Sequence, residues 1–185
     1  MTARVLLGLM VICNVLPAAY AETEGFTYTC DNSTCFWRRP IVDPPPGWVR
    51  DEESGAHFRF NAFVRKGETF TDSEAVMYAL AVYRKGAAPT LAEHISQNRD
   101  RHLKANPRSP VSKPTLTRNG DGKQLTTLTQ TPSKPDGDWE TVAFDEEGDY
   151  YLVFALSART KAAHDKARND FAAFVRGYHK VPKKP

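Results

Sequence analysis

Two cysteines lie close together near the N-terminus, in the segment Tyr28-Thr-Cys-Asp-Asn-Ser-Thr-Cys35. Two thiols this close can form a structural disulfide, act as a redox couple or bind a metal ion. Redox couples normally have two residues between the cysteines, whereas four separate Cys30 from Cys35. We therefore predict a structural disulfide between Cys30 and Cys35, with a redox or metal site as the alternative.

The five histidines do not have the spacing of a metal site. His94 and His102 are eight residues apart in a predicted helix, so they share a face but stand about 12 Å apart along its axis. Asn98, between them, is a poor metal ligand. His164 lies beside Asp165, away from the apolar positions of another predicted helix. We predict that these histidines are solvated or peripheral and that the chain binds no metal.

Acidic residues crowd one predicted turn, Asp145-Glu-Glu-Gly-Asp149. In an exposed turn their pKa values have little reason to differ, so we predict a solvated turn rather than an acid–base pair. A partner-binding patch or an ion site is the alternative. The segment Asn119-Gly-Asp-Gly122 lacks the carboxylates of a calcium loop and predicts a hairpin turn.

The sequence contains no nucleophile elbow, phosphate-binding loop, dinucleotide loop or zinc-helix motif. We therefore predict no catalytic residues, no cofactor and a non-enzymatic protein. An enzyme with a dispersed site is the less favoured alternative.

Phe36, Trp37, Arg38 and Arg39 follow the cysteines and combine aromatic rings with guanidinium groups. Such a cluster more often packs a terminal arm onto a domain. Because aromatic residues and arginine are enriched at protein interfaces, these four residues are also the best candidate in the sequence for a partner-binding surface.

The first 21 residues have the three parts of a secretory signal peptide. Arg4 precedes an apolar run over 5–16, and Ala19 and Ala21 are small residues suited to cleavage. The run is shorter than the roughly 20 residues that span a bilayer. We predict a periplasmic or secreted protein without a membrane span after cleavage, with a retained anchor or a lipid on Cys13 as alternatives. The formal net charge of +3 gives no reason to expect nucleic acid as a partner.

The remaining chain divides into an N-terminal arm over 22–43, irregular apart from its disulfide loop, a single domain over 44–179 and a basic tail over 180–185. Apolar periodicity predicts helices over 90–105 and 160–178, the first capped by Thr90 and Glu93. The second has an apolar stripe that includes Phe171, Phe174 and Tyr178. Strands are predicted over 57–64, 75–83, 115–118, 123–129, 139–144 and 150–156. This order predicts an α+β fold, an antiparallel β-sheet flanked by helices.

The start Pro45-Pro-Gly-Trp48, the Phe-rich segment after it, the run over 76–82 and the final strand and helix resemble the PsbP-like fold. The resemblance extends from about residue 44 to residue 178 and implies an α/β/α sandwich. It also implies a non-enzymatic protein that acts in binding, as a chaperone or in assembly.

We accordingly expect an exported accessory module that binds a protein partner, with an immunity-like or assembly role as a specific version. The alternative is a pocket for a small apolar ligand. Aromatic residues on the predicted strands would line that pocket, although they are more simply core: Phe58, Phe60, Tyr78, Tyr83, Phe144, Tyr151 and Phe154.

Overall fold

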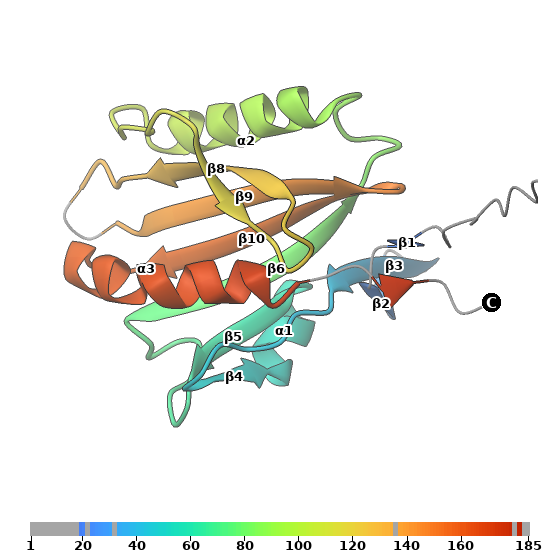
Figure 1. The fold of residues 1–185 in the computed structure, drawn as a ribbon, viewed down its shortest axis with the longest axis horizontal. Coiled ribbons are helices and arrows are strands. Elements are labelled where there is room, and N and C mark those ends of the chain that lie inside the picture. The colour runs from blue at the N-terminus through green and yellow to red at the C-terminus, as the bar shows by residue number, and fades with distance from the viewer. Residues whose placement is uncertain (1–18, 21–22, 31–32, 135–136, 179–180, 183–185) are drawn as a thin grey trace, which may run out of the picture.

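The computed structural model describes residues 19–20, 23–30, 33–134, 137–178 and 181–182, and side chains within 38–134 and 137–178. Its main sheet has nine antiparallel strands in the order β2-β3-β6-β10-β9-β8-β7, with β5 also paired to β6 and β4 to β5 (Figure 1). The strands are β2 Thr23–Cys30, β3 Ser33–Pro40, β4 Trp48–Asp51, β5 Asn61–Arg65, β6 Ala75–Tyr83, β7 Thr115–Arg118, β8 Gln124–Gln130, β9 Trp139–Glu147 and β10 Tyr150–Ala158.

The centre of the sheet is formed by the most apolar segments of the chain, β6, β9 and β10. Phe154 of β10 lies opposite Ala79 of β6 and Ala143 of β9, and all three residues are fully buried. Strands that are apolar at nearly every position suit a sheet covered on both faces. The strands predicted over 75–83, 139–144 and 150–156 are confirmed.

Helix α3, Lys161–Arg176, covers one face of the sheet. Thr160 caps it by accepting a hydrogen bond from the Ala163 backbone N–H at 3.1 Å. Phe174 packs edge-on against Phe63 of β5, with ring centroids 5.0 Å apart. This contact lies in the larger of the two hydrophobic clusters, as the apolar stripe of the helix predicts.

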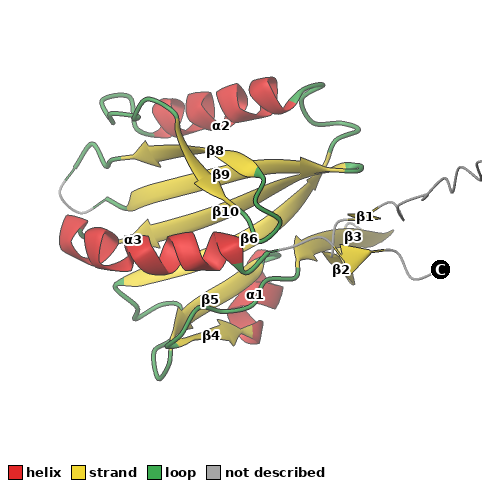
Figure 2. Cartoon of the chain, viewed as in Figure 1, coloured by secondary structure: helices red, strands yellow, loops and turns green. Residues whose placement is uncertain are grey.

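Helix α2, Leu91–Ala105, lies on the opposite face, over β8 and β9 (Figure 2). Thr90 accepts a hydrogen bond from the Glu93 backbone N–H at 3.2 Å, as in a capping box. Leu91 and Ile95 pack on a second cluster that includes Val142 and Val153. With one helix on each face, the predicted α/β/α sandwich is confirmed.

The strand predicted over 57–64 is wrong in its first half. Helix α1, Glu52–Phe58, ends there, and β5 begins at Asn61. Asp51 caps the helix by accepting from the Ser54 N–H at 2.9 Å, and acidic residues follow it in the first turn. Arg59 ends the helix in a left-handed conformation, with φ of 63°. These terminal signals outweigh the alternation of aromatic residues that predicted a strand.

The expectation of an irregular arm is also wrong, because β2 and β3 pair over 23–30 and 33–40. Both segments are rich in threonine and aromatic residues, which favour strands. Strand β3 joins the main sheet where Arg38 lies opposite Ala81. Cys30 lies opposite Ser33 and Cys35 opposite Tyr28. The cysteine side chains lie outside those described, so the disulfide stays a prediction.

The predicted signal peptide lies largely outside the described residues, except for β1, Ala19–Tyr20, which pairs with β11, Val181–Pro182. Cleavage after Ala21 would remove β1 and with it this short pairing. Within the described part of the chain, no helix combines the length and the apolar character needed to cross a membrane.

Candidate functional site

An aromatic patch, formed by Phe58, Phe60 and Phe70, lies where α1 meets the sheet. The Phe58 and Phe60 rings stack with centroids 5.5 Å apart and planes 10° apart, and Phe70 lies 5.2 Å from Phe58. Phe58 is 50% exposed. Its position at the end of α1, with Arg59 turning the chain, places Phe58 and Phe60 side by side rather than in the alternation of a strand.

A hollow of about 480 Å³ opens beside the aromatic patch. Tyr78 of β6 lies in it, stacked on Phe60 with ring centroids 4.8 Å apart. Arg159, after β10, donates a hydrogen bond to the Thr71 carbonyl and so links the opposite sides of the hollow. Each ring of the patch thus packs against at least one other aromatic ring.

Carboxylates surround the other side of Phe58, in a shallow surface hollow whose acidic members we call the acidic rim: Asp51, Glu52, Glu53, Glu68 and Asp72. Arg50 is the only lysine or arginine lining this hollow among the residues that the structure describes. Burial raises the pKa of Glu52, but Arg39 and Arg50 lower it by more, so this carboxyl stays ionised at neutral pH. The surface beside Phe58 is therefore predominantly negative.

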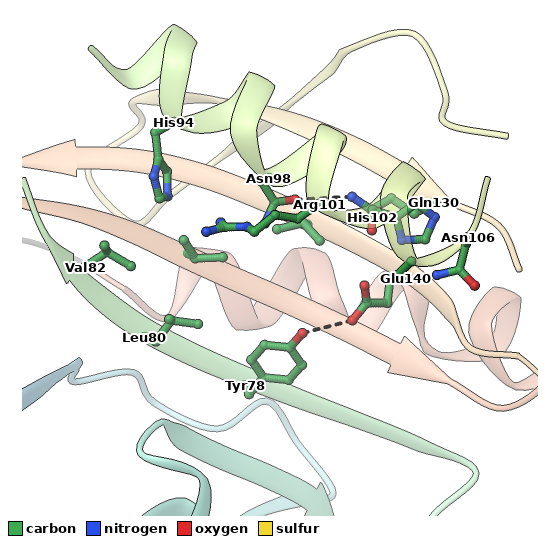
Figure 3. A pocket seen from close by; sticks show the side chains of 13 residues that line it. Tyr78, Leu80, Val82, His94, Asn98, Arg101, His102, Asn106, Gln130 and Glu140 are labelled. Carbon is green, nitrogen blue, oxygen red and sulfur yellow. Dashed lines mark hydrogen bonds between the residues drawn. The ribbon is translucent and has the colours of Figure 1, made fainter. Parts of the chain in front are cut away.

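A second hollow, the polar cleft, lies between α2 and the sheet and has a volume of about 320 Å³ (Figure 3). Its apolar floor is formed by Leu80 and Val82 of β6 and by Val153 of β10. His94 and Arg101 extend from α2 toward this floor. They are seven residues apart, which is close to two helical turns and places them on the same face.

His94 is 3% exposed, and its ring stacks on Tyr151 with centroids 4.6 Å apart. Its Nε2 atom has no hydrogen-bond partner among the described residues. Burial lowers the pKa of His94, and the positive charge of Arg101 lowers it further, so the ring is neutral at pH 7. The helix position that fixes this ring was predicted, but its burial was not.

The other end of the polar cleft is closed by hydrogen bonds between side chains. Tyr78 donates to Glu140 of β9 at 2.9 Å, and Gln130 of β8 donates to Asn98 of α2 at 3.2 Å (Figure 3). Burial, together with the carboxylate of Glu140, raises the pKa of Tyr78 well above its ordinary value. Burial also raises the pKa of Glu140, partly offset by the bond from Tyr78.

The prediction of solvated or peripheral histidines is wrong for His94 and His164. His164 Nε2 lies 2.8 Å from Thr141 Oγ1, and the ring is buried between α3 and β9. Residues of distant strands cover both rings, Tyr151 of β10 for His94 and Thr141 of β9 for His164. Only the tertiary packing decides which of these polar positions are covered.

The prediction of a solvated acidic turn over 145–149 is also wrong in part. Strand β9 continues to Glu147, so Asp145 and Glu147 lie on the sheet and are buried. Asp145 accepts from Asn119 Nδ2 at 3.3 Å and pairs with Lys123. The hairpin turn that contains Asn119 thus supplies the partners that the buried carboxylate requires.

Of the four candidate partner-binding residues, Arg39 has an internal role. It is 3% exposed, and its Nη2 lies 2.9 Å from Glu52 Oε2 in α1, so it joins β3 to that helix. Arg38 is exposed, with its guanidinium 5.8 Å from the centre of the Tyr150 ring. The side chains of Phe36 and Trp37 lie outside those described, so their partner-binding role stays a prediction.

Across the described ranges, no three histidine, cysteine, aspartate or glutamate side chains gather as metal ligands would. Six of the seven aromatic side chains predicted to be core or pocket lining take one of these roles, whereas Tyr83 is 50% exposed. Phe144, Tyr151 and Phe154 are buried, whereas Phe58, Phe60 and Tyr78 line the hollow beside the aromatic patch.

The chain was compared with family models, curated proteins and solved structures. No family model and no curated protein sequence matches the chain. The solution structure of cyanobacterial PsbP (CyanoP) from Synechocystis sp. PCC 6803 is similar, with 14% identity and a TM-score of 0.42 over 94% of this chain and 100% of that chain. The α+β class of this chain rests on its own strands and helices.

Proposed function

We propose that this chain is an exported, non-enzymatic binding module whose aromatic patch receives an apolar side chain of a partner protein. The observation that carries the proposal is the half-exposed Phe58 ring, held by Phe60 and Phe70 rather than buried in the core. Clustered aromatic side chains at a hollowed surface are typical of interaction sites. Export is inferred from the pattern of residues 1–21.

Charge complementarity narrows the partner to a segment with lysine or arginine beside its apolar side chain. The acidic rim lies on one side of Phe58, and neither Glu53 nor Glu68 forms an ion pair within the described ranges. A basic residue next to the anchoring side chain would be attracted by these carboxylates, whereas an acidic residue would be repelled by them. An exposed rim of this kind mainly affects the association rate and makes binding sensitive to salt.

The contribution of Phe58 to the free energy of binding follows from the exposed fraction of its side chain. A phenylalanine buries about 200 Å² when fully covered, so covering the exposed half removes about 100 Å² of apolar surface from water. At about 25 cal/mol per Å², this contributes about 2.5 kcal/mol, or about 60-fold in affinity.

The test uses Phe58→Ser with Leu116→Ser as the matched control. Leu116 is 65% exposed on β7, at the opposite edge of the sheet, so both variants remove one exposed apolar side chain. Mature protein carrying a photoreactive residue at position 58 or 116 is cross-linked in cell envelope and culture medium, and products are identified by mass spectrometry. Affinity for the identified partner is then measured for both serine variants.

We expect a partner cross-linked from position 58 alone, with affinity lowered about 60-fold by Phe58→Ser and unchanged by Leu116→Ser. The contact should map to an apolar side chain next to lysine or arginine. Identical cross-links from both positions, or a contact segment rich in acidic residues, would refute the proposal.

A further inference from the structure

The polar cleft is a second candidate site, separate from the aromatic patch. It lies on the other side of Tyr78, under α2, and combines an apolar floor with Arg101 and His94 at one end. Its volume of about 320 Å³ is at the lower end of the range of small-molecule sites, about 300–1,000 Å³. Tyr78 lines both hollows, and the other residues of the cleft take no part in the proposed contact at Phe58.

We propose that the polar cleft binds a small organic carboxylate, with the carboxylate between Arg101 and His94 and the apolar body on Leu80, Val82 and Val153. Arg101 lines the cleft, and its side chain runs back along α2 toward His94 (Figure 3). No acidic side chain of the described residues forms an ion pair with it. Its guanidinium can therefore offer a planar pair of donors to a carboxylate.

His94 supplies the second, independent observation. Its side chain lines the cleft and is 3% exposed, and its Nε2 atom is buried without a hydrogen-bond partner in the described protein. Leaving a buried polar atom unpaired is costly, so such atoms tend to occur where a ligand bonds them. In the tautomer with hydrogen on Nε2, the neutral ring donates to a carboxylate oxygen, next to the donors of Arg101.

The remaining charged group of the cleft favours one orientation of the ligand. Glu140 lies at the opposite end, where Tyr78 donates to it. A second carboxylate close to Glu140 would be repelled, so the anionic group belongs at the His94 end. The floor between the two ends carries only apolar side chains, which suits a hydrocarbon or aromatic body rather than a polyanion such as a nucleotide.

The test measures binding of matched probes by titration calorimetry. Decanoate and phenylacetate are compared with decanol and phenylacetamide, which keep the apolar body and lack the charge. The proteins are the wild type, Arg101→Met, His94→Phe and the control Arg99→Met. Arg99 is exposed on α2 and does not line the cleft, so its removal changes the net charge by the same amount.

We expect at least one carboxylate to bind the wild type about tenfold or more tightly than its neutral analogue. Arg101→Met and His94→Phe should each lower the affinity for that carboxylate by a similar factor, and Arg99→Met should leave the affinity unchanged. Imidazole ¹⁵N NMR should show the Nε2 resonance of His94 shifting as the carboxylate binds.

Equal affinity for charged and neutral probes, equal losses in Arg101→Met and Arg99→Met, or no carboxylate binding at all would each overturn the proposal. The cleft and the aromatic patch are separable. The Phe58→Ser variant should still bind the carboxylate, and the Arg101→Met variant should still bind the protein partner. Failure of one proposal therefore leaves the other intact.

Discussion

Replacing His94 with phenylalanine should make the protein more stable, which is an unusual expectation for a buried residue. The imidazole has no partner at Nε2 among the residues that the structure describes, and an unpaired buried polar atom costs about 1–3 kcal/mol. Phenylalanine keeps the aromatic contact with Tyr151, at 4.6 Å in the wild type, and removes the polar atoms. Because its ring is slightly larger, we expect a net gain of about 1 kcal/mol in the free energy of unfolding at pH 7.5.

The gain in stability from His94→Phe should grow as the pH falls. The folded state lowers the pKa of His94, so below the ordinary histidine value of about 6.5 the unfolded chain binds a proton that the folded protein resists. Wild-type stability therefore falls as the pH drops below this value, whereas the phenylalanine variant lacks this contribution. At pH 5.5 the difference between the two proteins should widen by up to about 1.4 kcal/mol.

Urea denaturation of both proteins at pH 7.5 and 5.5 measures these differences, with His164→Phe as the control. Nε2 of His164 is hydrogen-bonded to Thr141 at 2.8 Å. Losing this bond in His164→Phe should lower the free energy of unfolding by about 1 kcal/mol at pH 7.5. Equal losses of stability in His94→Phe and His164→Phe would refute the reasoning, because they would show that both rings are held by equivalent bonds.

Three further predictions follow from other parts of the fold. Asn119→Ala should lower the free energy of unfolding by about 2 kcal/mol, since Asn119 bonds two backbone N–H groups and Asp145; a loss below about 0.5 kcal/mol in urea titrations would contradict this. Wild-type stability, followed by thermal melts, should fall as the pH drops below about 6.5, because burial lowers the pKa of His94, His102 and His164; a flat profile from pH 7 to 5 would be inconsistent. Mass spectrometry after alkylation of secreted protein should find Cys30 and Cys35 unmodified until reduction, whereas alkylation without reduction would exclude their disulfide.

The elements that position the polar cleft were predictable because their signals are local. Thr90 and Glu93 predict the start of α2, and the apolar run of β10 predicts a strand covered on both faces. Where two local signals compete, as at 52–65, the sequence alone favoured the wrong one. The cap at Asp51 and the left-handed Arg59 formed a short helix instead of a longer strand.

The sites themselves depend on contacts between segments distant in sequence. From the sequence, His94 is a polar position on a helix. In the fold it is buried against Tyr151 of β10, which lies 57 residues further along the chain. The aromatic patch likewise needs α1 and Tyr78 of β6 to meet. The sequence by itself determined the starts of α2 and α3, the central strands and the α+β class, because capping and periodicity act over a few residues. Tertiary structure alone decided which polar groups are buried and which rings stay exposed, because burial depends on how distant segments pack.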